Sequence, residues 1–156
     1  MTSKASIPPR TPDRDGDERC VLRSGSSQGA SRTFEVVIAP EPDLVSRLRR
    51  ITTTFLLRWS TPSSLADDAV VTVSELVTNG IEHGHGPVVL RARLTDKELL
   101  VEVSDESLVP ARLRAPTGDE VRGRGLLLVS ALAHDWGVRD EGRTTWAAFH
   151  VHGNTS

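Results

Sequence analysis

Apolar and polar residues recur in regular patterns from Thr33 onward, and these patterns predict both strands and helices. A β-branched run over residues 34–39 ends at Pro40 and predicts a short first strand. Apolar residues spaced by three or four then predict an amphipathic helix that ends near Trp59: Leu44, Leu48, Ile51 and Phe55. The other positions of this helix carry arginines, and the pattern favours a solvated face over a binding patch for them: Arg47, Arg49, Arg50 and Arg58.

A second helix is expected to begin at Ser64, which is a suitable N-cap, and to end at Gly84 and Gly86. Its apolar stripe follows the helical period: Leu65, Ala69, Val73, Leu76 and Ile81. Strict alternation over residues 88–94 and again over residues 99–103 predicts a β-hairpin.

Residues 106–122 contain prolines, a glycine and charges without any hydrophobic period. They predict a loop longer than the usual connection of about 4 to 6 residues, and long loops inside compact domains are usually functional. We interpret this loop as a lid. Gly123-Arg124-Gly125 is expected to open a third helix that continues through about residue 133, and a closing hairpin is expected over residues 136–139 and 145–151.

The order of these elements predicts an α+β fold, because the helices do not alternate singly with the strands. We expect a two-layer α/β sandwich whose mainly antiparallel mixed sheet carries helices on one face. The domain is expected to span residues 33–152. Residues 1–32 are rich in Ser, Arg, Asp, Gly and Pro with only isolated apolar residues, so they predict a disordered tail.

The composition narrows the functional classes. The length of 156 residues suits one domain, and the net charge of −2 provides no strong field that would recruit nucleic acid. Cys20 is the only cysteine, which excludes an intramolecular disulfide and a cysteine-based zinc site. The sequence shows neither a secretory leader nor an apolar stretch of about 20 residues, so a cytoplasmic protein without a membrane segment is expected.

Glu75 and Asn79 lie four residues apart on the second predicted helix and therefore share one face, with His83 one turn further. A carboxylate and an amide oxygen on one face can orient a hydroxyl group and a hard cation. Such a pair taken alone is more often a solvated helix face than a metal site.

Asp105 continues the inward-facing alternation of residues 99–103, toward the layer between sheet and helices. A carboxylate there needs a partner, and the exocyclic amine of adenine is a suitable donor. Ser107 would add a hydroxyl group or a water bridge to the same ring. The alternative is that Asp105 caps the turn after its strand.

Gly123 and Gly125 are expected to precede the third helix, where free N–H groups can bind a polyphosphate. Arg124 adds a positive charge at that place. The sequence is neither a P-loop nor a full dinucleotide fingerprint, and a simple hinge is the alternative.

In combination, these motifs resemble the histidine-kinase-like ATPases of the GHKL, or Bergerat, fold. The most similar type is the anti-sigma-factor serine/threonine kinase, found as small stand-alone bacterial regulators. The resemblance extends over roughly residues 33–151 and rests on five segments: 75–84, 103–107, 123–129, 135–138 and 144–146.

The resemblance implies ATP and Mg²⁺ as ligands and assigns a role to each matching residue. Asn79 would coordinate Mg²⁺ that bridges the phosphates, and Glu75 would be the general base. The other implied contacts are Asp105 with the adenine amine, Gly123 and Gly125 flanking the phosphate cradle, and Thr144 in a water network at the adenine. The chain departs from the family in carrying Glu106 and Ser107 where glycines are usual, and Arg143 where a lysine is common.

The function implied is an ATP-dependent protein serine/threonine kinase. It would bind a sigma factor or an anti-anti-sigma protein and phosphorylate a serine of the latter, and a homodimer is possible because relatives often dimerise.

The first alternative is a binding module that controls a partner by contact without phosphoryl transfer. A detached histidine-kinase catalytic domain is less favoured, because the chain lacks room for a dimerising helical hairpin. A metal site of Glu82, His83 and His85 is also disfavoured, because adjacent residues at a helix end point in different directions.

Overall fold

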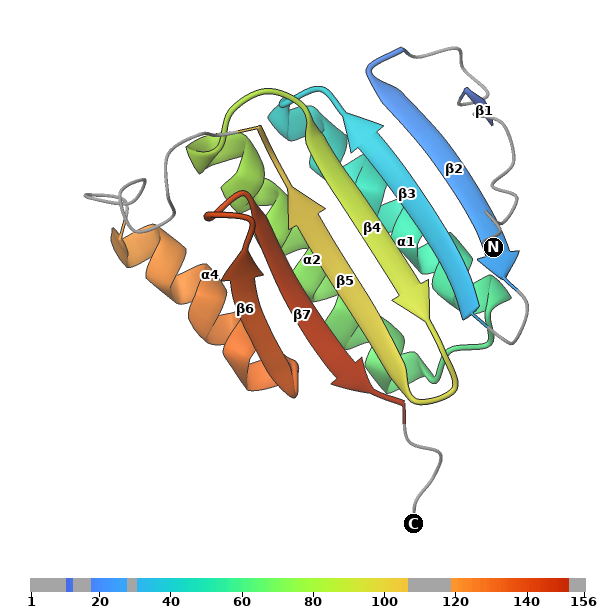
Figure 1. Cartoon of the computed structure of the whole chain (residues 1–156). Helices are drawn as coiled ribbons and strands as arrows, with labels where there is room; N and C mark the ends of the chain where they lie inside the picture. The colour runs from blue at the N-terminus through green and yellow to red at the C-terminus, as the bar shows by residue number, and fades with distance from the viewer. Residues whose placement is uncertain (1–10, 13–17, 28–30, 107–118, 152–156) are drawn as a thin grey trace.

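An antiparallel sheet and a layer of helices form the two layers of the fold, which is seen in a computed structural model (Figure 1). The structure describes residues 11–12, 18–27, 31–106 and 119–151, without the side chains of residues 11–12, 27 and 119–125. The strands are β1 (Thr11–Pro12), β2 (Cys20–Ser27), β3 (Ser31–Ile38), β4 (Val88–Leu94), β5 (Glu98–Ser104), β6 (Asp135–Arg139) and β7 (Thr144–His150). The helices are η1 (Pro42–Leu44), α1 (Val45–Arg58), α2 (Ser63–His83) and α4 (Asp119–Leu132).

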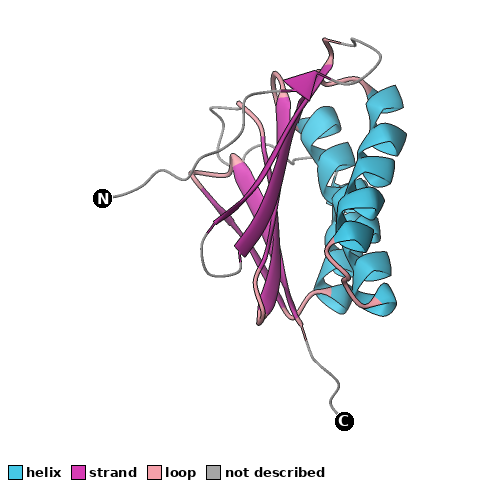
Figure 2. Cartoon of the chain, turned by 90° about the vertical axis from the view of Figure 1, so that its right-hand side faces the viewer, coloured by secondary structure: helices cyan, strands magenta, loops and turns pink. Residues whose placement is uncertain are grey.

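The strands of the described part lie in the order β1-β2-β3-β4-β5-β7-β6, and every neighbouring pair in it is antiparallel. Helices α1, α2 and α4 all cover one face of this seven-stranded sheet, as Figure 2 shows. The predicted α+β sandwich with helices on one face is therefore confirmed.

The core lies between the two layers and is built by the alternation of each strand. Every second residue of β3 and β5 is buried toward the helices: Phe34, Val36 and Ile38, then Leu99, Val101 and Val103. The ring of Phe34 stacks on Phe55 of α1 at 4.8 Å between centroids, and Trp59 lies 5.8 Å from both rings. This aromatic cluster fixes α1 against the sheet.

The predicted hairpin over residues 88–94 and 99–103 is β4 and β5, and its turn is closed by Thr95. The hydroxyl oxygen of Thr95 accepts hydrogen bonds from the N–H groups of Lys97 at 3.2 Å and Glu98 at 3.1 Å. The second predicted helix is α2, which extends to His83 before Gly84.

Strand β2 corrects the expectation of a disordered tail up to residue 32. It pairs along its whole length with β3, from Cys20 opposite Ile38 to Ser27 opposite Ser31. Cys20 is only 1% exposed, and Leu22 packs against the core. The hydrophobic pattern did not predict this strand because its second half is Ser-Gly-Ser-Ser. This half is held as a strand by main-chain hydrogen bonds with β3.

Helix α4 corrects a second expectation, because it begins at Asp119 rather than at Gly123. Residues 119–122, assigned to the loop, are helical, and residues 107–118 lie outside the described part. The sequence pattern did not predict the first turn of this helix, because the segment 123–125 contains two glycines and glycine is unfavourable inside helices. None of the described helices is long and apolar enough to cross a membrane.

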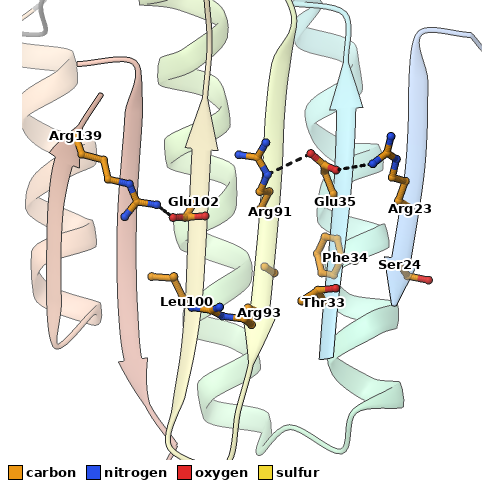
Figure 3. Close-up of a pocket in the computed structure, with 11 residues that line it drawn as sticks. Arg23, Ser24, Thr33, Phe34, Glu35, Arg91, Arg93, Leu100, Glu102 and Arg139 are labelled. Atoms are coloured by element: carbon orange, nitrogen blue, oxygen red, sulfur yellow. Dashed lines mark hydrogen bonds and ion pairs between the residues drawn. The ribbon is translucent and has the colours of Figure 1, made fainter. Parts of the chain in front are cut away.

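The sheet face opposite the helices carries a row of alternating charges, shown in Figure 3. Arg23, Glu35, Arg91 and Glu102 lie directly opposite one another across β2 to β5, and Glu102 forms an ion pair with Arg139 of β6. Nε of Arg91 donates a hydrogen bond to Glu35 at 3.2 Å. Opposite charges across neighbouring strands stabilise a sheet by roughly 0.2–1 kcal/mol per pair. The row therefore favours the observed register.

Deleting residues 1–30 removes β2 and should lower the melting temperature by at least about 8 °C, as expected for a loss of about 2 kcal/mol or more in stability. The physical reason is that the core loses the cover provided by Cys20 and Leu22. A chain that begins at Glu18 is the matched control and should melt within a few degrees of the full chain. Equal melting temperatures of the two truncated chains would show that β2 contributes nothing to the core.

Candidate functional site

Helix α2 presents Glu75 and Asn79 on the side that turns toward α4. Asp68, seven residues before Glu75 and on the same side, lines a hollow together with Leu132 and Ala133 at the end of α4. The two helices run in opposite directions on the same face of the sheet (Figure 1), so the second half of α2, which contains Glu75 and Asn79, lies beside the first half of α4. Both side chains are half-buried, and neither makes a hydrogen bond or ion pair with a described residue.

Helix α2 packs on β4 and β5 beside these two residues, at Gly80. A Cβ atom built on Gly80 would lie 3.5 Å from Val88 and 3.6 Å from Val103, in ordinary van der Waals contact. Buried Leu76 and Val77 continue this contact along the helix. The packing fixes the height of α2 above the sheet, and with it the position of the polar pair.

The end of α2 lies directly against Asp105 at the end of β5. A Cβ atom built on Gly84 would lie only 2.5 Å from Cγ of Asp105, so only glycine permits this approach. The N–H group of Glu106 donates to the carbonyl oxygen of His85 at 2.8 Å, which ties the segment after α2 to the segment after β5. Asp105 is therefore half-buried on the helix side of the sheet, as the alternation of β5 predicts.

The N–H group of Asp105 also donates to the carbonyl oxygen of Arg143 at 2.9 Å, which brings the start of β7 to the same end of the sheet. Thr144 follows Arg143, but its side chain lies on the face away from the helices, paired with Ser104. The Thr144 hydroxyl donates to Asp140 at 2.7 Å, so the Ser104 hydroxyl donates to Thr144 at 2.8 Å. The structure therefore does not bring Thr144 together with Asp105.

Thr145 is the threonine on the helix side, and the sequence reasoning missed it. It lies opposite Val103, whose side chain is buried toward the helices, and is itself half-buried. Ala147, Ala148 and Phe149 of β7 are all buried, so burial along β7 does not alternate, and the register against β5 is what distinguishes Thr145 from Thr144.

The structure places the segment Gly123-Arg124-Gly125 inside α4 rather than before it. In a helix that begins at Asp119, the N–H groups without an intrahelical acceptor are those of residues 119–122. The expectation that Gly123 and Gly125 precede the helix is therefore wrong, whereas their position opposite the second half of α2 follows from the antiparallel packing. Ser107 lies outside the described residues.

His83 occupies the last turn of α2 beside Gly84. Its Nε2 atom is buried, finds no hydrogen-bond partner among the described residues and lies 3.8 Å from Oε1 of Glu82. His85 is exposed. Within the described part of the chain, no group of His, Cys, Asp and Glu is arranged to hold a metal ion by itself.

The sequence matches a known family over residues 38–149, which is described as the histidine kinase-like ATPase domain. The matched range runs from the end of β3 to β7 and includes all of α2, β5 and α4. No curated protein matches the chain.

Replacing Gly84 by alanine should destabilise the fold by about 1–3 kcal/mol, because the new methyl group overlaps the Asp105 carboxyl group and the carbonyl oxygen of Gly80, so that the Asp105 side chain and the end of α2 must shift. Gly80→Ala is the matched control on the same helix. Its methyl group fits, so the change should be neutral or stabilising by up to about 1 kcal/mol. Urea denaturation of both variants provides the comparison. A Gly84→Ala variant as stable as Gly80→Ala would show that the close contact with Asp105 is not a constraint.

Proposed function

The chain belongs to the histidine kinase-like ATPase domain family, and from this we propose that it binds ATP with Mg²⁺ between α2 and α4 and acts as an anti-sigma-type serine/threonine protein kinase. One observation carries the proposal. The half-buried carboxylate of Asp105 is held at the end of α2, and Glu75 and Asn79, which lie earlier on the same helix, have no described protein partner. These groups match the donors and acceptors of a nucleotide and its cation.

Asp105 is proposed to select adenine. Its carboxylate can accept a hydrogen bond from the exocyclic amine, whereas guanine presents a carbonyl oxygen at the same ring position. Gly84 fixes the carboxylate in place, so little entropy is lost when the base binds. Thr145, on the same side of the sheet, is better placed than Thr144 to join a water network at the base.

Asn79 is proposed to hold the cation through its side-chain oxygen, since Mg²⁺ prefers oxygen ligands. Bound Mg²⁺ would neutralise charge on the phosphate groups. The first turn of α4 offers N–H groups and the positive end of the helix dipole to the same phosphates. Gly123 and Gly125, in the following turn, keep the backbone accessible, and Arg124 adds positive charge.

Glu75 is proposed as the general base. It lies one helical turn, about 6 Å, from Asn79 along the helix axis, which separates the base from the metal ligand. In the proposed reaction, the serine oxygen of the partner forms a bond to the γ-phosphorus, the bond from that phosphorus to the β-γ bridging oxygen breaks, and ADP leaves. The proton of the serine hydroxyl passes to the Glu75 carboxylate.

The proposed partners are a sigma factor, which the protein would bind, and an anti-anti-sigma protein, which it would phosphorylate. A homodimer is also proposed.

A second candidate function is a binding module that acts without phosphoryl transfer. It is favoured by Glu106, whose side chain lies against Gly86 beside the base-binding carboxylate and adds negative charge where the family usually has glycine.

Replacing Asp105 by asparagine should weaken ATP binding by about 2 kcal/mol, roughly thirtyfold, because the adenine amine loses a charged acceptor. Discrimination against GTP should fall at the same time. Isothermal titration calorimetry with both nucleotides measures this, and Asp140→Asn is the control on the opposite face of the sheet. Unchanged ATP affinity in a folded Asp105→Asn variant would contradict the assignment.

Replacing Glu75 by glutamine should lower phosphoryl transfer by roughly 10²- to 10⁴-fold, the usual contribution of a general base, with Mg-ATP affinity nearly unchanged. Asn79→Ala should instead weaken Mg-ATP binding, because it removes an oxygen ligand of the cation. Transfer of radiolabelled phosphate to anti-anti-sigma proteins of the same cell provides the readout. If wild type and both variants bind ATP but none transfers phosphate, the binding module is the better conclusion.

A further inference from the structure

Helix α1 carries a stripe of basic residues on its outer side. Arg47, Arg50, Thr54 and Arg58 follow one another at intervals of three and four residues, so they share one face. The helix contains no acidic residue that could neutralise them along its own surface. The sequence pattern alone favoured a solvated face for these arginines, and the structure adds what lies beside them.

Strand β2 runs next to this stripe and forms a groove with it, which we name the α1 groove. The hollow has a volume of about 460 Å³ and is lined by Cys20, Leu22, Arg47, Arg50, Ile51, Thr54, Phe55 and Arg58. Its floor is apolar, because Cys20 and Phe55 are buried core residues and Leu22 and Ile51 pack against them. The guanidinium group of Arg58 lies 5.7 Å from the centroid of the Phe55 ring.

Two of the arginines that line the α1 groove, Arg50 and Arg58, have no carboxylate partner among the described residues. The acidic residues just before α1, Glu41 and Asp43, accept hydrogen bonds from Arg19 at 2.6 and 3.1 Å. Arg50 and Arg58 form no ion pair with any residue that the structure describes. On the open sheet face, by contrast, Arg91 and Arg139 are paired with carboxylates.

We propose that the α1 groove is a docking site for an acidic amphipathic segment of a partner protein. Apolar side chains of the segment would enter the floor beside Leu22 and Ile51, and its carboxylates would pair with Arg50 and Arg58 on the rim. An apolar floor under a charged rim suits such a segment better than a nucleic acid, whose phosphate backbone offers nothing to the floor.

This proposal goes beyond nucleotide binding and does not rest on it. The α1 groove contains none of Glu75, Asn79 and Asp105, so docking should occur with and without Mg-ATP. A chain that fails to bind ATP in calorimetry but still binds the segment would overturn the proposed kinase function and leave the docking site standing.

The test uses the full chain labelled with ¹⁵N and synthetic helix-forming peptides of about 15 residues. The probe peptide has leucines at helical spacing of three and four, flanked by glutamates. One control peptide has glutamine in place of the glutamates, and another has serine in place of the leucines. Titration to millimolar concentration should produce saturable shifts of the amides of α1 and β2 with the probe peptide and much smaller shifts with either control.

The variant Arg50→Glu should weaken binding of the probe peptide roughly tenfold or more, since a paired charge is replaced by a repelling one. Arg93→Glu is the matched control, because Arg93 is also exposed, has no ion pair among the described residues and lies on the other face of the sheet. Circular dichroism checks that both variants fold.

Three results would overturn the proposal. The first is the absence of shifts in α1 and β2 at millimolar probe peptide. The second is an equal loss of affinity in Arg50→Glu and Arg93→Glu, which would reduce the effect to net charge. The third is tighter binding of a single-stranded oligothymidylate to the same amides, which would make the groove a nucleic-acid surface.

Discussion

In the described part of the chain, helices cover the sheet on one face only, and the alternation of side chains along each strand therefore determines what every strand residue can do. Residues directed toward α1, α2 and α4 form the core or, as Asp105 does after the end of β5, lie against the end of α2. Residues directed the other way form the charge row with Arg91 and Glu102. A shift of register by one residue would exchange the two sets, so the apolar core also determines which polar groups face the candidate site.

Close backbone contacts at one end of the sheet bring the end of α2, the end of β5 and the start of β7 together at the candidate site. Gly84 allows Asp105 to lie against the end of α2, and the hydrogen bonds of Asp105 and Glu106 with Arg143 and His85 join β7 and α2 to the end of β5. Asn79 lies one turn before His83 on the same helix. The carboxylate that we propose to bind the base and the proposed metal ligand are thus positioned by the same packed helix.

The sequence predicted the elements with strong hydrophobic period and missed those that depend on tertiary contacts. The hairpin β4–β5 and helix α2 were found because their apolar residues repeat at intervals of two or of three and four. The sequence pattern did not predict strand β2, because half of this strand is polar. It did not predict the start of α4, because glycines, which are unfavourable in helices, lie near that end of the helix. Whether Thr144 or Thr145 faces the helices depends on the register of β7 against β5, and the sequence pattern of β7 alone does not determine this register.

The central claim is that a nucleotide binds on the helix side of the sheet, between α2 and α4. The most direct measurement is a ¹⁵N chemical-shift map of the full chain titrated with Mg²⁺ and a non-hydrolysable ATP analogue. If the nucleotide binds there, the largest amide shifts should occur at Gly84, Asp105 and Thr145, and only small shifts should occur at Arg91 and Glu102 on the open face. Shifts confined to the open face, or none at saturating nucleotide, would contradict it.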